Sequence, residues 1–302
     1  MLTNGTLWKD IDGNSIQAHG GMILEHDGIW YWYGENKGAP NCPGKNRVDV
    51  IGISCYSSVD LKNWKYEGLV IESEKTDEQH PLHYTKVCER PKVIYCEKTG
   101  KFVLWMHIDD KTYQMASIGV AVSDSPVGPF VLKTVIRPNG QESRDMTVFK
   151  DDDGVAYLVH SKDGNRTLNI ARLTDDYEDV DGYFVSVLID QIRESPALCK
   201  HNGAYYMVTS GCTGWKPNSA LYAKANFITG KWHLVDNPCE GENYRNTFGG
   251  QSTYIFEYNG QKYLMLDHWI PHDLQNSGYS ILPISFDEEN EMTVSWVEEF
   301  NV

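Results

Sequence analysis

The sequence predicts an all-β protein, a five-bladed β-propeller with four antiparallel strands in each blade. Two observations carry this prediction: one hairpin plan occurs five times along the 302 residues, and further strand-like runs flank each copy. No 3.6-residue period of apolar residues competes with these strand signals. A β-sandwich of similar length is the alternative fold, but it gives no reason for five copies of one hairpin plan.

Each copy centres on a glycine that follows a turn-forming residue and precedes a largely apolar run. The five pairs are Asp27-Gly28, Thr99-Gly100, Asp153-Gly154, Asn202-Gly203 and Asn259-Gly260. Such pairs between strand-like runs predict tight hairpins, because both turn residues must accept positive φ. Successive glycines are separated by 72, 54, 49 and 57 residues, which leaves room for four strands in each repeat.

The strands of each blade follow one order around this hairpin. The first strands are expected at residues 20–24, 90–94, 146–149, 195–198 and 252–256, and the second strands directly after the hairpin glycines. Outer pairs are expected at 51–56 with 64–66, 118–122 with 130–132, and 219–223 with 231–234. A ring of blades cannot be divided into independent cores, so we expect residues 1–302 to form one catalytic domain without an appended carbohydrate-binding module.

Composition excludes several classes of protein. The net charge of −15 argues against a nucleic acid or another polyanion as partner, because phosphate contacts need clustered Lys and Arg. No run approaches the roughly 18 apolar residues of a membrane-spanning helix, so no membrane partner is expected. The seven cysteines include no Cys-x-x-Cys pair, which is typical of reduced thiols rather than a zinc ribbon.

The N-terminus shows no signal peptide, which predicts a cytoplasmic protein, or a secreted one if the chain has been trimmed. The oligomeric state, monomer or otherwise, is left open by the sequence.

A polar residue occupies the same inner position in every blade, just before or at the start of the first strand. These residues are His19, Glu89, Asp145, Glu194 and Gln251. The innermost strands of a propeller begin at one mouth of its channel, so the five side chains should converge. Converging carboxylates raise one another's pKa and bring no stability, which indicates a functional site.

Paired acids across a pocket suggest glycoside hydrolysis, in which one group protonates the leaving oxygen and an opposite group handles water. The chain also has 18 Tyr and 9 Trp, whose rings can stack on sugars while staying partly wet. Trp215, Trp269 and Tyr113 are the candidates for this stacking, and packing within the blades is at least as well supported for each of them. The substrate expected is a neutral oligosaccharide or polysaccharide.

Several short motifs surround the inner positions. They are Trp8-Lys9-Asp10-Ile11-Asp12-Gly13, Gln17-Ala18-His19-Gly20-Gly21, Tyr31-Trp32-Tyr33-Gly34-Glu35, Glu89-Arg90-Pro91-Lys92, Ser143-Arg144-Asp145-Met146, Glu194-Ser195-Pro196-Ala197 and Gly249-Gly250-Gln251-Ser252. Together, and nearly from end to end, the chain resembles glycoside hydrolase family 43, in particular its exo-β-1,3-galactanase branch. The resemblance implies an exo-acting, inverting enzyme that releases galactose from β-1,3-galactan such as an arabinogalactan backbone.

The resemblance also implies a role for each matching residue. Glu194 corresponds to the general acid, and Asp145 to the residue that orients the sugar and tunes that acid. Most of the family takes its base Asp from the first blade, where this chain has Gln17-Ala18-His19. The galactanase branch shares this departure, and Gln251 then stands in the place of the base, acting as its imidic acid tautomer. The implied substrate contacts are Glu89, Glu35, Tyr113, Asn165, Thr213, Trp215 and His19.

Two other functions stay open from the sequence. An α-L-arabinofuranosidase or β-xylosidase of the same family would need an ordinary Asp base, and a non-catalytic sugar-binding propeller would need none. No cofactor is expected. The resemblance allows a structural calcium ion in the channel near His268, whereas Asp151-Asp152-Asp153-Gly154 lacks the spacing of a calcium loop and reads as a hairpin turn.

Overall fold

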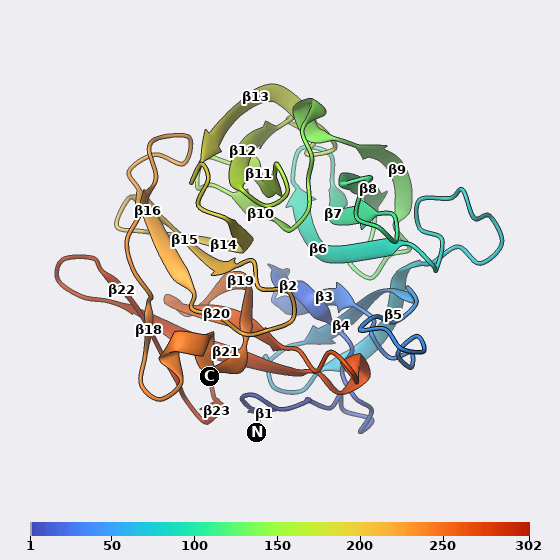
Figure 1. Cartoon of the computed structure of the whole chain (residues 1–302), viewed down its shortest axis with the longest axis horizontal. Coiled ribbons are helices and arrows are strands. Elements are labelled where there is room, and N and C mark those ends of the chain that lie inside the picture. The colour runs from blue at the N-terminus through green and yellow to red at the C-terminus, as the bar shows by residue number, and fades with distance from the viewer. Residues whose placement is uncertain (1) are drawn as a thin grey trace.

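Five antiparallel sheets are arranged as blades around a common axis (Figure 1). The computed structural model describes residues 2–302. In each blade the first strand in the chain lies nearest the axis, and the next three follow outward in order. The predicted five-bladed propeller is therefore confirmed.

The strands of the first three blades have these bounds. Blade 1 comprises β2 (His19–His26), β3 (Ile29–Glu35), β4 (Gly52–Ser58) and β5 (Lys65–Glu72). Blade 2 comprises β6 (Val87–Cys96), β7 (Lys101–Asp109), β8 (Ser117–Ser123) and β9 (Val131–Ile136). Blade 3 comprises β10 (Met146–Lys150), β11 (Ala156–Lys162), β12 (Thr167–Leu173) and β13 (Val180–Val187).

The last two blades are less regular at their outer edges. Blade 4 comprises β14 (Arg193–His201), β15 (Ala204–Gly211), β16 (Leu221–Ala225) and the two-residue β17 (His233–Leu234). Blade 5 comprises β19 (Gln251–Tyr258), β20 (Gln261–His268), β21 (Gly278–Phe286) and β22 (Met292–Ser295). Its outer edge carries a fifth strand, β18 (Cys239–Glu240), which pairs parallel with β22 and was not predicted. Three short 3₁₀ turns, η1 (Pro138–Gly140), η2 (Tyr244–Gly249) and η3 (Leu274–Asn276), lie in the connections.

The five predicted hairpins all join the first two strands of a blade, but they use two kinds of turn. In blades 1, 4 and 5 both turn residues have positive φ, for example Asn202 at 47° and Gly203 at 77°. In blades 2 and 3 only the glycine does, and its N–H closes a longer turn, as from Gly100 to the Cys96 carbonyl at 2.8 Å. The pattern also predicted positive φ at Thr99 and Asp153. This prediction is wrong, because the turns of blades 2 and 3 contain extra residues.

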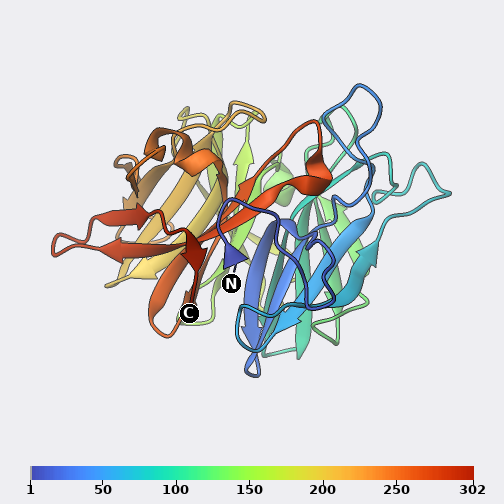
Figure 2. The ribbon, with the colours of Figure 1, turned by 90° about the horizontal axis from the view of Figure 1, so that it is seen from below.

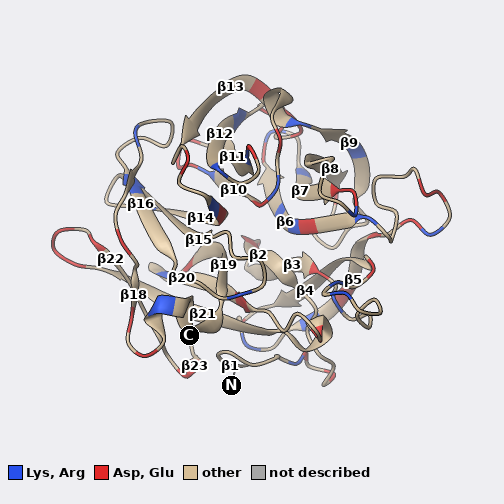
Figure 3. Cartoon of the chain, viewed as in Figure 1, with Lys and Arg blue, Asp and Glu red and all other residues tan. Residues whose placement is uncertain are grey.

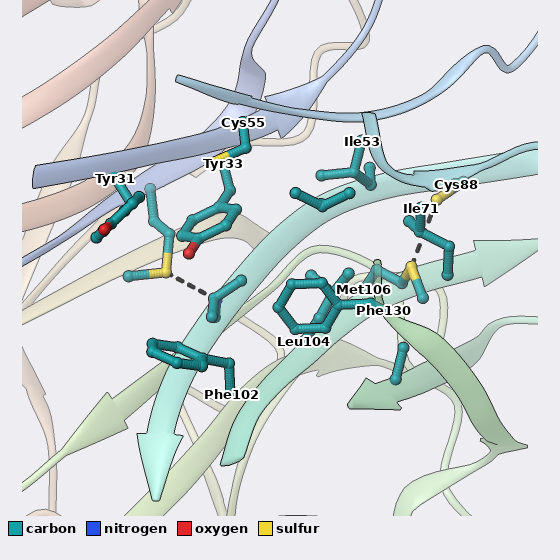
Figure 4. Packing of buried hydrophobic residues seen from close by; sticks show 14 of the residues in the cluster. Tyr31, Tyr33, Ile53, Cys55, Ile71, Cys88, Phe102, Leu104, Met106 and Phe130 are labelled. Carbon is teal, nitrogen blue, oxygen red and sulfur yellow. Dashed lines mark hydrogen bonds between the residues drawn. The ribbon is translucent and has the colours of Figure 1, made fainter. Parts of the chain in front are cut away.

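The hydrophobic core consists of five clusters, and each lies between two neighbouring blades. The cluster between blades 1 and 2 packs Tyr33 and Ile53 against Leu104 and Met106, as Figure 4 shows. Burial of apolar surface stabilises by roughly 25 cal/mol per Å². Because every cluster takes residues from two sheets, no blade has a complete core by itself. The five blades are therefore stable together, as a ring.

The ring is closed by the N-terminal segment rather than by a strand exchanged between blades 1 and 5. The strand β1 (Leu2–Thr3) pairs with β23 (Glu299–Phe300) near the C-terminus, and the two termini lie close together (Figure 2). Buried Asn4 forms hydrogen bonds through both ends of its amide: Nδ2 donates to the Val297 carbonyl at 2.9 Å, and Oδ1 accepts from the Ile281 N–H at 2.9 Å. One side chain thus links the N-terminal segment to β21 and to the chain end.

No helix in residues 2–302 is long and apolar enough to cross a membrane.

We predict that Asn4→Ala lowers the free energy of unfolding by about 2 kcal/mol, because it leaves buried backbone groups without partners. Chemical denaturation of the two proteins measures the difference. The exposed Asn14→Ala is the matched control and should unfold with the wild type. Equal unfolding of wild type and Asn4→Ala would show that this amide does not close the ring.

Candidate active site

The inner positions predicted from the sequence do lie at the starts of the innermost strands. His19 and Gln251 begin β2 and β19, Glu89 and Glu194 lie in the first residues of β6 and β14, and Asp145 directly precedes β10. In blades 1, 2, 4 and 5 the pairing of the inner strand with its neighbour shifts close to this residue. Such bulges bend a strand and redirect its side chains.

Left-handed backbone marks three of these bulges. Gly20, Arg90 and Ser195 directly follow the inner residue of their blades and have φ values of 58°, 54° and 54°. A Cβ built at Gly20 would lie 2.2 Å from Glu35 Oε1, so a larger residue there would displace this carboxylate. Bulges therefore present polar groups from several blades to one region at the middle of the ring, where Figure 3 shows charged residues on β6 and β14.

Arg90 is the group that connects these blades. Its guanidinium Nη2 lies 2.9 Å from Asp145 Oδ2 and donates to Ser195 Oγ and Gln251 Oε1, both at 2.8 Å. Its backbone N–H donates to Glu35 Oε1 at 2.9 Å. One buried cation thus contacts residues from four other blades, and Ser195 Oγ also donates to Asp145 Oδ2 at 2.6 Å.

The amide of Gln251 is held at both ends. Arg90 and the indole N–H of Trp269, the latter at 3.0 Å, can only donate, so the atom that they contact is the amide oxygen. Its Nε2 donates to Glu194 Oε1 at 3.2 Å and to Ser210 Oγ at 3.0 Å. The orientation of the amide is therefore fixed, with its N–H₂ group toward Glu194.

Glu194 has the properties of an acid that is protonated near neutral pH. Burial and the neighbouring Asp145 carboxylate raise its pKa to about 7, although Arg90 acts in the opposite direction. Its Oε2 accepts a hydrogen bond from Asn165 Nδ2 at 3.1 Å, and Asn165 is in turn held by Ser161 Oγ at 2.9 Å. The structure thus brings Asn165 to the carboxyl of Glu194.

Glu89, in contrast to Glu194, is held in its ionised form. Burial opposes its ionisation, but His107, Lys37 and Tyr113 outweigh this and lower its pKa to about 2. Tyr113 Oη donates to Glu89 Oε1 at 2.9 Å, and His107 Nδ1 lies 3.5 Å from Oε2. Burial lowers the pKa of His107, yet Asp109 and Glu89 together raise it to about 9. Glu89 is therefore a fixed carboxylate at the border of the pocket.

Glu35 lies next to Glu89 at the end of β3. Burial raises its pKa, and Lys37, whose Nζ lies 2.7 Å from Glu35 Oε2, acts against this. Both residues line a cavity of about 170 Å³ that also contacts Glu89, Tyr113 and Trp215. The predicted group of Glu35, Glu89 and Tyr113 is thus brought together around one hollow.

The other predicted contacts are placed less uniformly. Trp215 packs edge-on against Trp269, with ring centres 5.4 Å apart, and together they line a small hollow beside Gln251 and Ser210. Thr213 lies on the same exposed loop, where its hydroxyl donates to the Lys216 carbonyl at 2.5 Å. His19 has no exposed surface; it lies 3.3 Å from Asp267 and stacks on Tyr279.

The sequence interpretation missed the residues that organise the acids. Arg90 and Ser195 stand next to Glu89 and Glu194 in their motifs, and this adjacency was the only available signal. Lys37 follows Glu35 by two residues and gave a similar signal, whereas His107 gave none, because its proximity to Glu89 depends on the pairing of β6 with β7. Trp269 was expected to stack on sugar, and its N–H contact with Gln251 could not be foreseen.

The residues around His268 do not form a cluster suited to calcium. Its Nε2 lies 2.7 Å from Ser280 Oγ, and no group of three or more His, Cys, Asp or Glu in residues 2–302 gathers at metal-binding distance. Calcium prefers six to eight oxygen ligands, several of them carboxylates. The ion near His268 thus stays a prediction from the family resemblance.

Comparison with known proteins decides the family. The model of glycosyl hydrolases family 43 matches residues 45–263, which is more than half of the chain. The chain belongs to glycoside hydrolase family 43. It is therefore a glycoside hydrolase, and the resemblance predicted from the motifs is confirmed.

Several family 43 structures are similar to the chain along its whole length. A β-1,3-galactosidase solved with galactodeoxynojirimycin is 39% identical, with a TM-score of 0.94 and coverage of 100% of both chains. An exo-β-1,3-galactanase from Phanerochaete chrysosporium, solved with β-1,3-galactotriose, is 31% identical, with a TM-score of 0.88 and coverage of 97% of this chain and 66% of that one.

A curated relative is more distant. The β-D-galactofuranosidase of Aspergillus niger is 28% identical over 236 residues, which cover 72% of this chain and 65% of that protein. The chain thus spans slightly less than two thirds of the length of this family 43 relative.

We predict that Asp145→Asn shifts the alkaline limb of glycoside hydrolysis to lower pH by about one unit. The family resemblance predicts that Glu194 acts as a protonated acid, and loss of the neighbouring negative charge lowers its pKa. The pH dependence of kcat measures the shift. The exposed Asp175→Asn should leave the profile unchanged, and an unmoved limb in Asp145→Asn would contradict the assignment of Glu194.

Proposed function

We propose that this family 43 enzyme is an exo-acting, inverting β-1,3-galactosidase that releases galactose from neutral galactan, such as an arabinogalactan backbone. The observation that carries the proposal is the buried Glu194, its pKa raised to about 7, beside Asp145 and Gln251 in a fold that matches β-1,3-galactosidase structures with TM-scores up to 0.94. The reaction needs no cofactor.

Action at a chain end is supported by the solved structures that the fold matches. An exo-β-1,3-galactanase is among them, with a TM-score of 0.88 and coverage of 97% of this chain. Within the site, the buried Lys92 lies two residues from Arg90 on β6 and donates from Nζ to the Gly20 carbonyl at 2.8 Å. Tyr113 and Trp215 line the cavity beside Glu89.

Glu194 is proposed as the general acid. Transfer of its proton to the leaving glycosidic oxygen turns a poor leaving group into an alcohol, and a pKa of about 7 leaves a large fraction of the carboxyl protonated at neutral pH. Asp145 is proposed to hold that pKa and to orient the sugar. Arg90 keeps Asp145 in place through the 2.9 Å ion pair.

Gln251 is proposed to stand in the place of the general base. An inverting mechanism needs a water between acid and base, which in carboxylate pairs lie about 6.5–9.5 Å apart. Gln251 Nε2 lies only 3.2 Å from Glu194 Oε1, so substrate must separate the two groups. The imidic acid tautomer would also place a proton on the oxygen that already accepts from Arg90 and Trp269.

The resting contacts of Gln251 therefore stabilise the ordinary amide. A catalytic role as a base requires that substrate binding replace at least one of these N–H donors and free Nε2 from Glu194. This requirement makes the proposal for Gln251 separable from the proposal for Glu194.

The general acid is tested by Glu194→Gln. Release of galactose from β-1,3-galactobiose should fall by about 10²- to 10⁴-fold. Hydrolysis of β-galactosyl fluoride should fall far less, since fluoride leaves without a proton. The exposed Glu288→Gln is the control. An equal loss on both substrates would contradict the role of Glu194 as the acid. If wild type released no galactose, the proposed activity would be wrong. A panel of other glycosides would then distinguish an arabinofuranosidase, a xylosidase and a non-catalytic sugar-binding protein.

The base is tested by Gln251→Ala. With β-galactosyl fluoride the variant should lose about 10²-fold in kcat, and added azide should restore turnover by forming α-galactosyl azide. Azide enters from the face that the activated water uses, so the product has inverted configuration. Full activity of the variant, or a loss that azide does not change, would show that Gln251 only positions Glu194.

A further inference from the structure

The cavity beside Glu89 and Tyr113 has a charge opposite to that of the whole chain. It measures about 170 Å³ and extends from these residues under the segment between β3 and β4. Its cationic lining residues are Lys37, Arg47, Lys86 and Lys111, and its anionic ones are Glu35 and Glu89. In a chain with a net charge of −15, this excess of cations around one hollow is a local reversal of sign.

Both carboxylates of the cavity are matched by other groups. Lys37 Nζ lies 2.7 Å from Glu35, and the imidazole of His107 lies 3.5 Å from Glu89. Lys37 is therefore used internally, and the positive charge of Arg47, Lys86 and Lys111 is left for the rest of the cavity.

Arg47 and Lys86 are held mainly by neutral groups. Arg47 Nη2 donates to the Thr85 carbonyl at 3.0 Å and lies 3.5 Å from Asp49, which is half-exposed. Lys86 Nζ donates to the Gln79 carbonyl at 2.9 Å. Within residues 2–302, no acidic side chain forms an ion pair with Lys86 or with the exposed Lys111. Carbonyl oxygens position a cation without cancelling its charge, so the cavity stays positive.

We propose that this cavity binds an anionic substituent of the galactan, the carboxylate of a uronosyl unit or a sulfate ester, next to the galactose that is cleaved. The inference rests on the proposed function and names a class of substrate for the same site. Guanidinium and ammonium groups bind carboxylate and sulfate oxygens by charge-assisted hydrogen bonds. At about 30 Å³ per water molecule, the cavity of about 170 Å³ holds at least about six waters, which is space for one such group.

The shared border explains how one substrate reaches both places. Glu89 and Tyr113 line the cavity and also lie among the residues proposed to bind galactose. A substituent carried by that galactose can enter the cavity without displacing Glu194 or Gln251. The remainder of the polysaccharide is neutral, in accord with the overall negative charge of the enzyme.

The experiment compares β-1,3-galactobiose with the same disaccharide bearing either a uronosyl unit or a sulfate on its terminal galactose. The variants are the double change Lys86→Met with Lys111→Met, and Lys133→Met on β9 as a control exposed lysine. Wild type should show a kcat/KM about tenfold higher for the anionic substrates at low salt, as two partly exposed ion pairs allow. The double variant should lose this preference and keep wild-type activity on the neutral disaccharide.

Ionic strength provides a second readout. Raising it from about 0.02 M to about 0.5 M should reduce the preference of wild type, because salt screens partly exposed charges. If only one anionic disaccharide is favoured, the result supports the site and identifies its chemistry as carboxylate or sulfate.

Two results would overturn the proposal. Wild type could show no preference for either anionic disaccharide, or the double variant could keep the preference just as the control Lys133→Met does. Failure of wild type to release galactose from any of the three substrates would instead overturn the proposed function.

Discussion

The arrangement of the active-site mouth depends on one buried cation. Arg90, on blade 2, forms an ion pair with Asp145 of blade 3 and donates to side chains from blades 4 and 5, while its backbone binds Glu35 of blade 1. Removing one partner of such a buried network leaves an uncompensated charge, which costs several kcal/mol. The contacts therefore require the inner strands of blades 2 to 5 and the second strand of blade 1 to keep one register. The positions of the site residues and the packing of the blades at the axis thus share one structural basis.

The same scaffold places two glutamates in opposite protonation states. Glu89 is surrounded by His107, Lys37 and Tyr113, which outweigh its burial, and its pKa falls to about 2. Glu194 has burial and Asp145 on one side against Arg90 on the other, and its pKa rises to about 7. Neighbours within hydrogen-bonding distance, rather than residue type, separate a fixed carboxylate from a group able to give up a proton.

Rigid strands and variable loops divide the work of the site. The acids and the amide lie at the bulged starts of the inner strands, whose packing is shared between neighbouring blades. The cavity next to them is formed largely by the segment between β3 and β4 and by the loop that carries Lys111. Groups that react need fixed positions, whereas loops can change substrate preference without altering the core. The charge of the loops is therefore where selectivity among carbohydrate substrates is expected.

The sequence alone determined the repeat, the five inner positions and the family, because hairpin turns and strand starts are local signals that short motifs record. It predicted Glu89, Asp145, Glu194 and Gln251 at one mouth of the ring, and the structure places them at the starts of the inner strands. It could not predict the extra strand β18, the two kinds of hairpin turn, or the buried place of His19.

Only the tertiary structure decided which groups contact one another at the centre. The hydrogen bond from Arg90 to Gln251 joins blades 2 and 5, which are far apart in the sequence, and Trp269 contacts the same amide from just after β20. The cations around the neighbouring cavity come from three separate segments. Residue types and their spacing predict which side chains a strand brings to the axis. The pKa values, the amide orientation and the local charge depend on distances between blades, and these distances exist only once the ring has closed.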